Sequence, residues 1–266
     1  MLTLTASLFW LLTDDAFRVT EANVSFEGLR HADEAEVRDY LTDLDRGPNV
    51  FRVRASEIVS ELSDLTEVDA AFATVTLPGD VSVRLVERDP LFIWEGERAW
   101  LVDEEGMLFA PGEPAMAIVD PETGDPETEA DDPGSVARES LPIVEDARLT
   151  DVPPTVGSYL PPADMEVMRQ LLAITPELLG SESESLHLRV DEHEGFVLES
   201  HDLAWSAVFG RYTPSVQPPH VVPRQVQCLR WLLASKEAKL DQVRLALSDT
   251  ACGTWTELDS KPAKGN

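Results

Sequence analysis

The densest cluster of potential metal ligands in the sequence is the run Asp-Glu-His-Glu at residues 191–194. Together with His187 or His201, these carboxylate and imidazole groups have the chemistry of a divalent metal site. The run also lies between two predicted strands, in a tight turn where charged residues are expected because the turn is solvated. We therefore predict a solvated turn here and no metal site.

Motifs for other common chemistries are missing from the sequence. It contains no P-loop, no G-x-G-x-x-G fingerprint, no G-x-S-x-G nucleophile elbow and no H-E-x-x-H zinc motif. Asp and Glu are so numerous that some pair will be close by chance, so spacing cannot assign a general acid and base. His220 follows two prolines and is predicted to be a loop residue rather than a base. The sequence therefore predicts no catalytic residue, no cofactor and no small-molecule substrate.

Cys228 and Cys252 are the two cysteines of the chain. They lie in different predicted elements and not at a metal-ligand spacing such as C-x-x-C, so zinc is not indicated. In an oxidising compartment they could form one disulfide, but the sequence does not give the Cα separation on which this depends. The sequence therefore leaves open whether these two cysteines are paired or free.

Length and composition predict an acidic chain of two domains. The chain has 266 residues, of which 43% are hydrophobic, and can bury a core. At roughly 100 to 200 residues per domain, this length predicts two domains. Lys and Arg number 21 against 50 for Asp and Glu, and the formal net charge is -29. Because this charge repels nucleic acid, we predict no nucleic-acid partner and ascribe the acidity to surface solubility.

The beginning of the chain resembles the end of a membrane span. Residues 2–12 are apolar apart from small Thr and Ser, and Asp14 and Asp15 soon follow. A helix of this length rises about 16 Å against a hydrocarbon core of about 30 Å, so it cannot cross alone. It lacks the basic segment and cleavage site of a secretory signal, so we predict the remnant of a transmembrane helix at 1–13. A first helix buried in a soluble domain is the alternative.

Residues 17–88 have the pattern of a β-α-α-β-β unit. Apolar and polar residues alternate in its strands, apolar residues recur at helical spacing in its helices, and Pro78-Gly79-Asp80 has turn chemistry. The predicted elements are a strand at 17–26, helices at 33–44 and 58–65, and strands at 68–77 and 81–85.

Residues 89–258 are predicted to be rich in strands. The stretch 111–140 is dominated by Pro, Gly, Asp, Glu and Thr, and we predict a disordered acidic loop because it cannot bury enough apolar surface. Structure resumes near 141–144, and the tail at 259–266 is predicted to be disordered. The predicted strands are at 91–94, 100–103, 107–109, 186–190, 196–199, 203–209, 243–247 and 251–255, and the predicted helices at 165–174 and 222–233.

Short motifs occur in a characteristic order along the chain, and they resemble the bacterial cell division family FtsQ, called DivIB in Gram-positive organisms. The motifs before the middle of the chain look like the POTRA domain of that family and the start of its β domain, and those after it are looser matches. In chain order, the full set of motifs is Phe17-x-Val19, Val24-x-Phe26-x-Gly28, Asn49-Val50-Phe51, Ile58, Leu62, Val68, Pro78, Val83 to Arg88, Pro90, Trp94, Trp100 to Asp103, Gly106, Leu108-Phe109, Leu141-Pro142, Gly210-Arg211, Leu232-Leu233 and the stretch 243–255.

The resemblance implies an α+β fold with a POTRA domain at 17–88, a β-rich domain with a mixed sheet at 89–258 and a transmembrane helix before them. The family is a single-pass membrane protein whose two extracytoplasmic domains recruit other septation proteins. The resemblance therefore implies a non-catalytic scaffold at the division septum. Its partners would be FtsB-like and FtsL-like division proteins, with the membrane contacted through the N-terminal helix.

The resemblance also implies a partner-binding segment near the C-terminus, because FtsB pairs along the last strand of the family's β domain. An edge strand offers unpaired N–H and C=O groups to an incoming segment, while alternate side chains set specificity. Trp255 would be the anchor, and ordinary packing of its ring against the sheet is the alternative. The matching positions are Leu247, Asp249, Thr250, Ala251, Cys252 and Trp255.

Functions of other classes remain as alternatives. A transport or secretion component can carry a POTRA domain, and would continue into a membrane barrel of alternating apolar strands. The chain could also be another extracytoplasmic binding protein. A hydrolase with dispersed carboxylates would need a concave pocket in which those carboxylates have perturbed pKa values.

Overall fold

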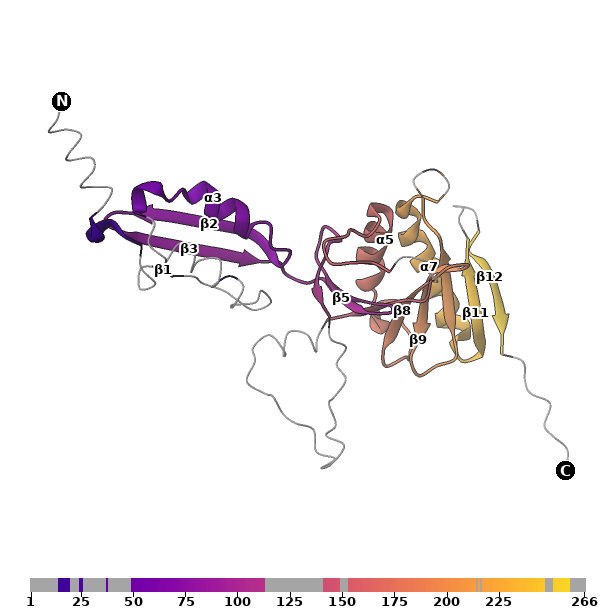
Figure 1. The fold of residues 1–266 in the computed structure, drawn as a ribbon. Coiled ribbons are helices and arrows are strands. Elements are labelled where there is room, and N and C mark those ends of the chain that lie inside the picture. Colours follow the sequence, from indigo (N-terminus) through magenta and orange to yellow (C-terminus); the bar gives the residue numbers. More distant parts are fainter. Residues whose placement is uncertain are drawn as a thin grey trace, which may run out of the picture. The chain divides into compact units, whose positions relative to one another are not determined.

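The computed structural model describes residues 14–19, 24–25, 37, 49–112, 141–148, 153–213, 215, 217–246 and 251–258. The chain divides between Asp89 and Pro90 into two compact units, and we call the described residues up to Asp89 unit 1 and those from Pro90 unit 2 (Figure 1). The predicted membrane segment at 1–13, most of the acidic loop and the tail from 259 lie outside the described residues.

None of the helices described is both long enough and apolar enough to span a membrane.

Unit 1 contains a three-stranded sheet in the order β1-β3-β2. β2 and β3 form an antiparallel hairpin, and β1 runs parallel to β3. Every second residue of β3 is buried, and these side chains pack with Ile58 and Leu62 of α3, which covers one face of the sheet. The elements are η1 (Asp15–Phe17), β1 (Val24–Ser25), η3 (Val50–Arg52), α3 (Ala55–Leu62), β2 (Val68–Thr76) and β3 (Asp80–Glu87).

The elements of unit 1 agree in part with the prediction. The helix near Ile58 and the hairpin formed by β2 and β3 are confirmed, because the apolar periodicity that predicted them is also the pattern of burial. The predicted strand at 17–26 is described as a 3₁₀ turn and the short strand β1. The predicted helix at 33–44 is outside the described residues except for Val37, so the POTRA assignment stays a prediction.

Unit 2 contains a nine-stranded sheet in the order β12-β11-β10-β9-β8-β7-β4-β5-β6. The strands are β4 (Phe92–Glu95), β5 (Ala99–Val102), β6 (Leu108–Pro111), β7 (Ile143–Asp146), β8 (Leu186–Asp191), β9 (Gly195–Ser200), β10 (Ser206–Gly210), β11 (Leu240–Leu245) and β12 (Gly253–Glu257). The helices are α5 (Pro162–Leu172), α6 (Pro176–Leu179), η4 (Pro219–Val221), α7 (Val222–Lys236) and η5 (Glu237–Lys239).

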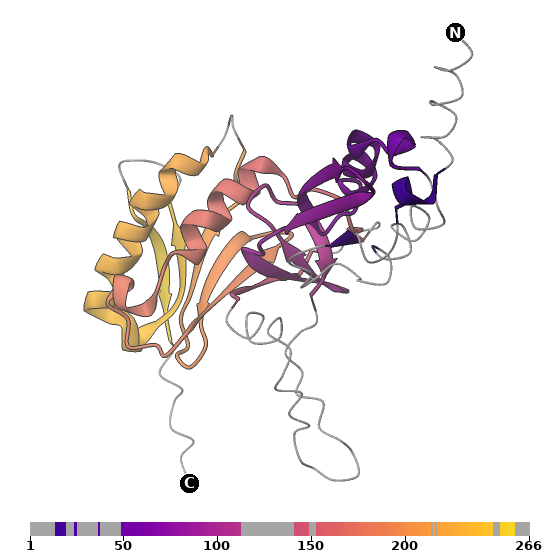
Figure 2. The ribbon, with the colours of Figure 1, turned by 90° about the vertical axis from the view of Figure 1, so that its left-hand side faces the viewer.

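The sheet of unit 2 is mixed. The pairs β4–β7, β7–β8 and β10–β11 are parallel, and the others are antiparallel. Parallel neighbours need a crossover connection. Helices supply it for two of the three pairs, because α5 and α6 lie between β7 and β8 in the chain and α7 lies between β10 and β11, whereas β5 and β6 lie between β4 and β7. Figure 2 shows α5 and α7 side by side on one face of the sheet. The predicted α+β class with a mixed sheet in the second half is confirmed.

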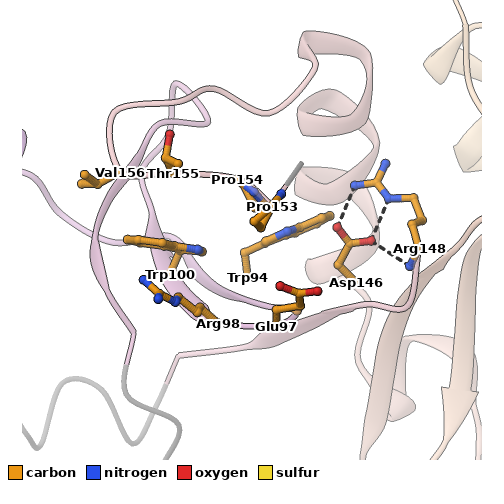
Figure 3. Close-up of a pocket in the computed structure, with 11 residues that line it drawn as sticks. Trp94, Glu97, Arg98, Trp100, Asp146, Arg148, Pro153, Pro154, Thr155 and Val156 are labelled. Carbon is orange, nitrogen blue, oxygen red and sulfur yellow. Dashed lines mark hydrogen bonds and ion pairs between the residues drawn. The ribbon is translucent and has the colours of Figure 1, made fainter. Parts of the chain in front are cut away.

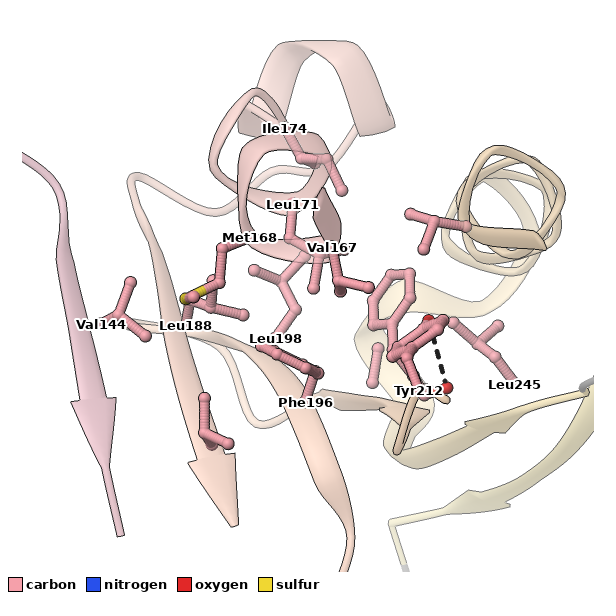
Figure 4. Close-up of a cluster of buried hydrophobic side chains, with 14 of the residues drawn as sticks. Val144, Val167, Met168, Leu171, Ile174, Leu188, Phe196, Leu198, Tyr212 and Leu245 are labelled. Atoms are coloured by element: carbon pink, nitrogen blue, oxygen red, sulfur yellow. Dashed lines mark hydrogen bonds between the residues drawn. The ribbon is translucent and has the colours of Figure 1, made fainter. Parts of the chain in front are cut away.

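The main core of unit 2 lies between this helical layer and the sheet. Figure 4 shows Val167, Met168 and Leu171 of α5 directed toward Leu188 and Leu198 of the sheet. All five side chains are at most 3% exposed. Apolar side chains on the opposite face of β4, β5 and β6 form a second, smaller cluster.

A buried polar network fixes α7 on β10. The backbone carbonyl oxygen of Phe209 accepts hydrogen bonds from Gln217 Nε2 at 2.9 Å and Gln225 Nε2 at 3.0 Å. The Tyr212 hydroxyl donates to Gln225 Oε1 at 2.6 Å, and burial of this hydroxyl raises the pKa of Tyr212. Buried polar groups are costly unless they are paired, so this network specifies one position of α7 on the sheet.

Candidate functional site

The outermost strand β12 gives the sheet of unit 2 an open edge. β12 pairs with β11 in the register Val243↔Trp255 and Leu245↔Gly253. Within the described ranges, no backbone segment pairs with its other side, and Figure 1 shows β12 as the last strand beyond β11. An edge of this kind presents unpaired backbone donors and acceptors.

The opposite edge of the same sheet is covered by the chain itself. At β6, the Leu108 N–H donates to the Ser158 carbonyl at 2.9 Å, and the Gly157 N–H donates back to the Leu108 carbonyl at 2.7 Å. The Leu160 N–H also donates to the Gly106 carbonyl at 2.9 Å. The segment 157–160 therefore caps the start of the β6 edge, at residues 106–108, whereas no described backbone segment pairs with the outer side of β12.

The backbone groups of Trp255 face the open side of β12. The Ala246 N–H donates to the Cys252 carbonyl at 3.1 Å, so the carbonyl of Cys252 faces β11. Backbone groups alternate in direction along an antiparallel strand. The N–H and C=O of Thr254 therefore face β11, and those of Trp255 point outward.

The indole ring of Trp255 lies on the face of the sheet that α7 covers. Trp255 is opposite Val243, which is fully buried, and directly opposed residues share a face. Lys236 Nζ lies 5.1 Å from the ring centroid and forms a 2.6 Å ion pair with Glu257, which lowers the pKa of Glu257. Trp255 is still 39% exposed, so this residue combines partial packing with an accessible surface.

A disulfide joins Cys228 of α7 to Cys252 at the start of β12. The two Cα atoms are 5.2 Å apart. The structure therefore decides a question that the sequence leaves open, because the pairing depends on how α7 packs beside β12. Cys228 is 3% exposed, whereas Cys252 is partly exposed.

Sequence reasoning missed Trp231 on α7. Its side chain is 62% exposed, and it lies three residues after Cys228, on the flank of the helix that carries the disulfide. The predicted helix at 222–233 included this residue, but Trp231 lies outside the apolar stripe that predicted the helix and that is buried in the structure. The signal that could have found it is a large aromatic residue outside that stripe.

The structure describes part of the predicted partner-binding segment. Leu247, Asp249 and Thr250 lie outside the described residues. Ala251 is exposed, and it leads through the partly exposed Cys252 into β12. The assignment of all six positions as partner-binding residues stays a prediction.

The run at 191–194 forms a tight turn between β8 and β9. Asp191 Oδ1 accepts the backbone N–H groups of His193 at 2.7 Å and Glu194 at 2.9 Å, and these bonds lower the pKa of Asp191. Glu194 forms an ion pair with Arg244 of β11 at 2.5 Å. Among the residues that the structure describes, no three His, Cys, Asp or Glu side chains are grouped so as to hold a metal ion.

A pocket of about 700 Å³ lies elsewhere in unit 2, at the β4–β5 hairpin (Figure 3). Trp94 and Trp100, which pair across the hairpin, form part of its wall, and the segment 153–156 faces them. Both rings are largely buried, at 1% and 8% exposure.

Two of the charged groups that line this pocket, Asp146 and Arg148, are paired with each other. Arg148 Nε donates to Asp146 Oδ1 at 2.7 Å, and its guanidinium lies 5.4 Å from the Trp94 ring centroid. Asp164 is 3.7 Å from Arg148, and burial raises the pKa of Asp164. The described lining residues include no Cys, His or Ser, and a fixed ion pair of this kind stabilises the pocket wall rather than providing a free acid or base.

Unit 1 also has an edge strand, β2. It pairs with β3 and has no second backbone partner in the described part of unit 1. Phe72 of β2 is 49% exposed, and the Arg84 guanidinium lies 4.8 Å from its ring centroid. The Arg84 side chain covers part of this ring. β2 is therefore a second edge against which any test of β12 must be compared.

The described fold is that of an α+β protein with an open-edged mixed sheet, and parts of the chain are similar to known cell division proteins. The cell division protein FtsQ of Rickettsia felis is 30% identical over 104 residues, which are 39% of this chain and 38% of that protein. FtsQ of Corynebacterium glutamicum is 25% identical over 130 residues, 48% of this chain and 58% of that protein. These matches support the FtsQ/DivIB family for this chain, as the order of its motifs predicts.

The chain spans less than two thirds of the length of these relatives. No protein-family model matches it.

Proposed function

We propose that this chain is a non-catalytic scaffold of the cell division machinery that binds FtsB-like and FtsL-like proteins by strand pairing along β12. The observation that carries this proposal is the difference between the two edges of one sheet. Segment 157–160 caps β6, whereas β12 has no backbone partner among the described residues. The similarity to cell division proteins supports a partner from the division machinery, and the family resemblance of the motifs suggests its FtsB-like and FtsL-like members.

In this proposal, the partner is recognised through backbone hydrogen bonds to β12 and through two aromatic side chains. The outward N–H and C=O of Trp255 pair with the incoming strand, and main-chain hydrogen bonds of this kind give affinity without fixing the sequence. The rings of Trp255 and Trp231 cover apolar side chains of the partner and supply specificity. The disulfide joins Cys228 of α7, which carries Trp231, to Cys252, which immediately precedes the strand that carries Trp255.

The same proposal places both units outside the cytoplasm at the septum, with residues 1–13 as part of a membrane anchor. The Cys228–Cys252 disulfide supports this location, because disulfides persist in oxidising compartments and are rare in the cytosol. The acidic composition is compatible with a solvated scaffold and unfavourable for nucleic acid.

The Trp255→Ala variant is expected to bind an FtsB-like extracytoplasmic segment from the same genome about thirtyfold more weakly than the unmodified chain. Truncation of a partly buried interface Trp typically costs about 2 kcal/mol or more, which corresponds to this change in Kd. The measurement is calorimetric titration of the full chain with that segment.

Tyr159→Ala is the matched control for this titration. Tyr159 is 62% exposed, and its backbone lies beside Met107 at the capped β6 edge. Loss of this aromatic ring is expected to leave the Kd unchanged. Equal weakening by both variants, or none by Trp255→Ala, would remove the assignment of the partner to β12.

A further inference from the structure

β12 contributes little to the core of unit 2. Residues 254–257 of this strand are exposed and Gly253 is partly exposed, so none of the five is buried. The register of the pairing between β11 and β12 shifts between Leu240 and Val243, so this part of the ladder is irregular. Ladder hydrogen bonds without buried side chains give only marginal stability to a strand pair in water.

The disulfide is the strongest link between β12 and the rest of the unit. Cys252 packs against the main core, where Cys228 is buried. At the other end of the strand, the contacts include the Lys236 ion pair with Glu257, a hydrogen bond from the Leu258 N–H to the Lys239 carbonyl at 2.8 Å, and a hydrogen bond from the Gln242 N–H to Thr256 Oγ1 at 3.2 Å, and all of them lie at exposed positions. Ion pairs at exposed positions stabilise weakly. The beginning of β12 therefore depends mainly on the covalent link.

We propose that the Cys228–Cys252 disulfide is a redox-dependent clamp that keeps β12 in the sheet, so that reduction of this bond releases the edge strand. The expected effect on partner binding rests on the function proposed above, whereas the release of β12 does not. Neighbouring elements should remain in place, because Leu229 and Leu232 of α7 and Val243 of β11 are fully buried in the core.

The chemistry of release is thiol–disulfide exchange with a dithiol reductant. A thiolate of the reductant attacks Sγ of Cys252, the more exposed of the two residues, and Cys228 leaves as a thiolate that takes up a proton. The second thiol of the reductant then attacks the mixed disulfide and displaces Cys252, which is also protonated. In sum, the protein gains two electrons and two protons, and the reductant becomes a cyclic disulfide.

The test is amide hydrogen exchange of the full chain, followed by mass spectrometry and NMR, before and after treatment with dithiothreitol. Reduction is expected to accelerate exchange of the Thr254 N–H about thirtyfold or more, because a disulfide commonly contributes a free energy equivalent to that factor. Amides of β8, β9 and β10 should keep their protection. The double variant Cys228→Ala/Cys252→Ala should match the reduced chain whether or not the reductant is present.

Unchanged exchange at Thr254 in both the reduced chain and the double variant would overturn the clamp. If protection is lost throughout unit 2 as well as at Thr254, the bond stabilises the whole unit, and the clamp is again overturned. Titration with the FtsB-like segment separates the two proposals. Faster exchange of the Thr254 N–H together with a higher Kd after reduction supports both proposals. Faster exchange of this N–H with an unchanged Kd supports the clamp and removes β12 as the docking edge.

Discussion

Trp255→Pro is expected to abolish binding of an FtsB-like strand, whereas Trp255→Ala only weakens it. Both variants remove the indole ring, but proline also removes the backbone N–H that points away from β11. Its ring occupies the space that an incoming carbonyl would need. Proline is tolerated on an edge strand where its missing N–H faces solvent, so β12 should remain paired with β11 in the free protein. The measurement is titration of each variant with the same segment.

The comparison of these two variants isolates the contribution of the backbone. Retained exchange protection of the Thr254 N–H would show that β12 is still in the sheet in both. With that control satisfied, equal Kd values for the alanine and proline variants would show recognition through the side chain alone. The proposal that the partner pairs with β12 through its backbone would then be wrong.

Gly253→Ala is expected to displace the start of β12 and to lower the free energy of unfolding of unit 2 by about 1–3 kcal/mol. Gly253 has φ +123°, a conformation that residues with a Cβ rarely adopt. An added Cβ would lie inside van der Waals contact of the Arg244 carbonyl and 2.9 Å from the Ala246 backbone nitrogen. Urea unfolding followed by tryptophan fluorescence measures the stability, and titration with the FtsB-like segment should show weaker binding.

Gly96→Ala is the control for this substitution. Gly96 lies in the β4–β5 turn, where an added Cβ would be no closer than 3.8 Å to Asp146. The change in stability should remain within about 0.5 kcal/mol, as for most surface substitutions. Equal stability of the two glycine variants would contradict the close approach of β12 to β11 that the structure describes.

Local periodicity predicted most of the individual elements. Alternation at Val81, Val83 and Leu85 predicted β3, and helical spacing of apolar residues predicted α5 and α7. These patterns succeed because burial on one face imposes the same period on the sequence that it imposes on the structure. The short helix α6 was missed, since its four residues are too few to show a helical period.

The arrangement of those elements could not be predicted in the same way. The parallel pairing of β10 with β11 depends on the packing of α7, and the disulfide between Cys228 and Cys252 follows from that packing. The capping of β6 by segment 157–160 uses backbone hydrogen bonds, which every residue except proline can form and which leave no signature in side chains. The resemblance identified the C-terminal segment as a candidate, but only the strand order separates its open edge from the capped one.

Amide exchange of the Trp255 N–H, measured by NMR with and without the FtsB-like segment, tests strand pairing on β12 most directly. In the free chain, this N–H should exchange rapidly, while the Thr254 N–H is protected by β11. Binding should protect the Trp255 N–H and leave the amides of β2 in unit 1 unchanged. A bound complex in which Trp255 still exchanges rapidly, or in which protection appears on β2 instead, would contradict the account.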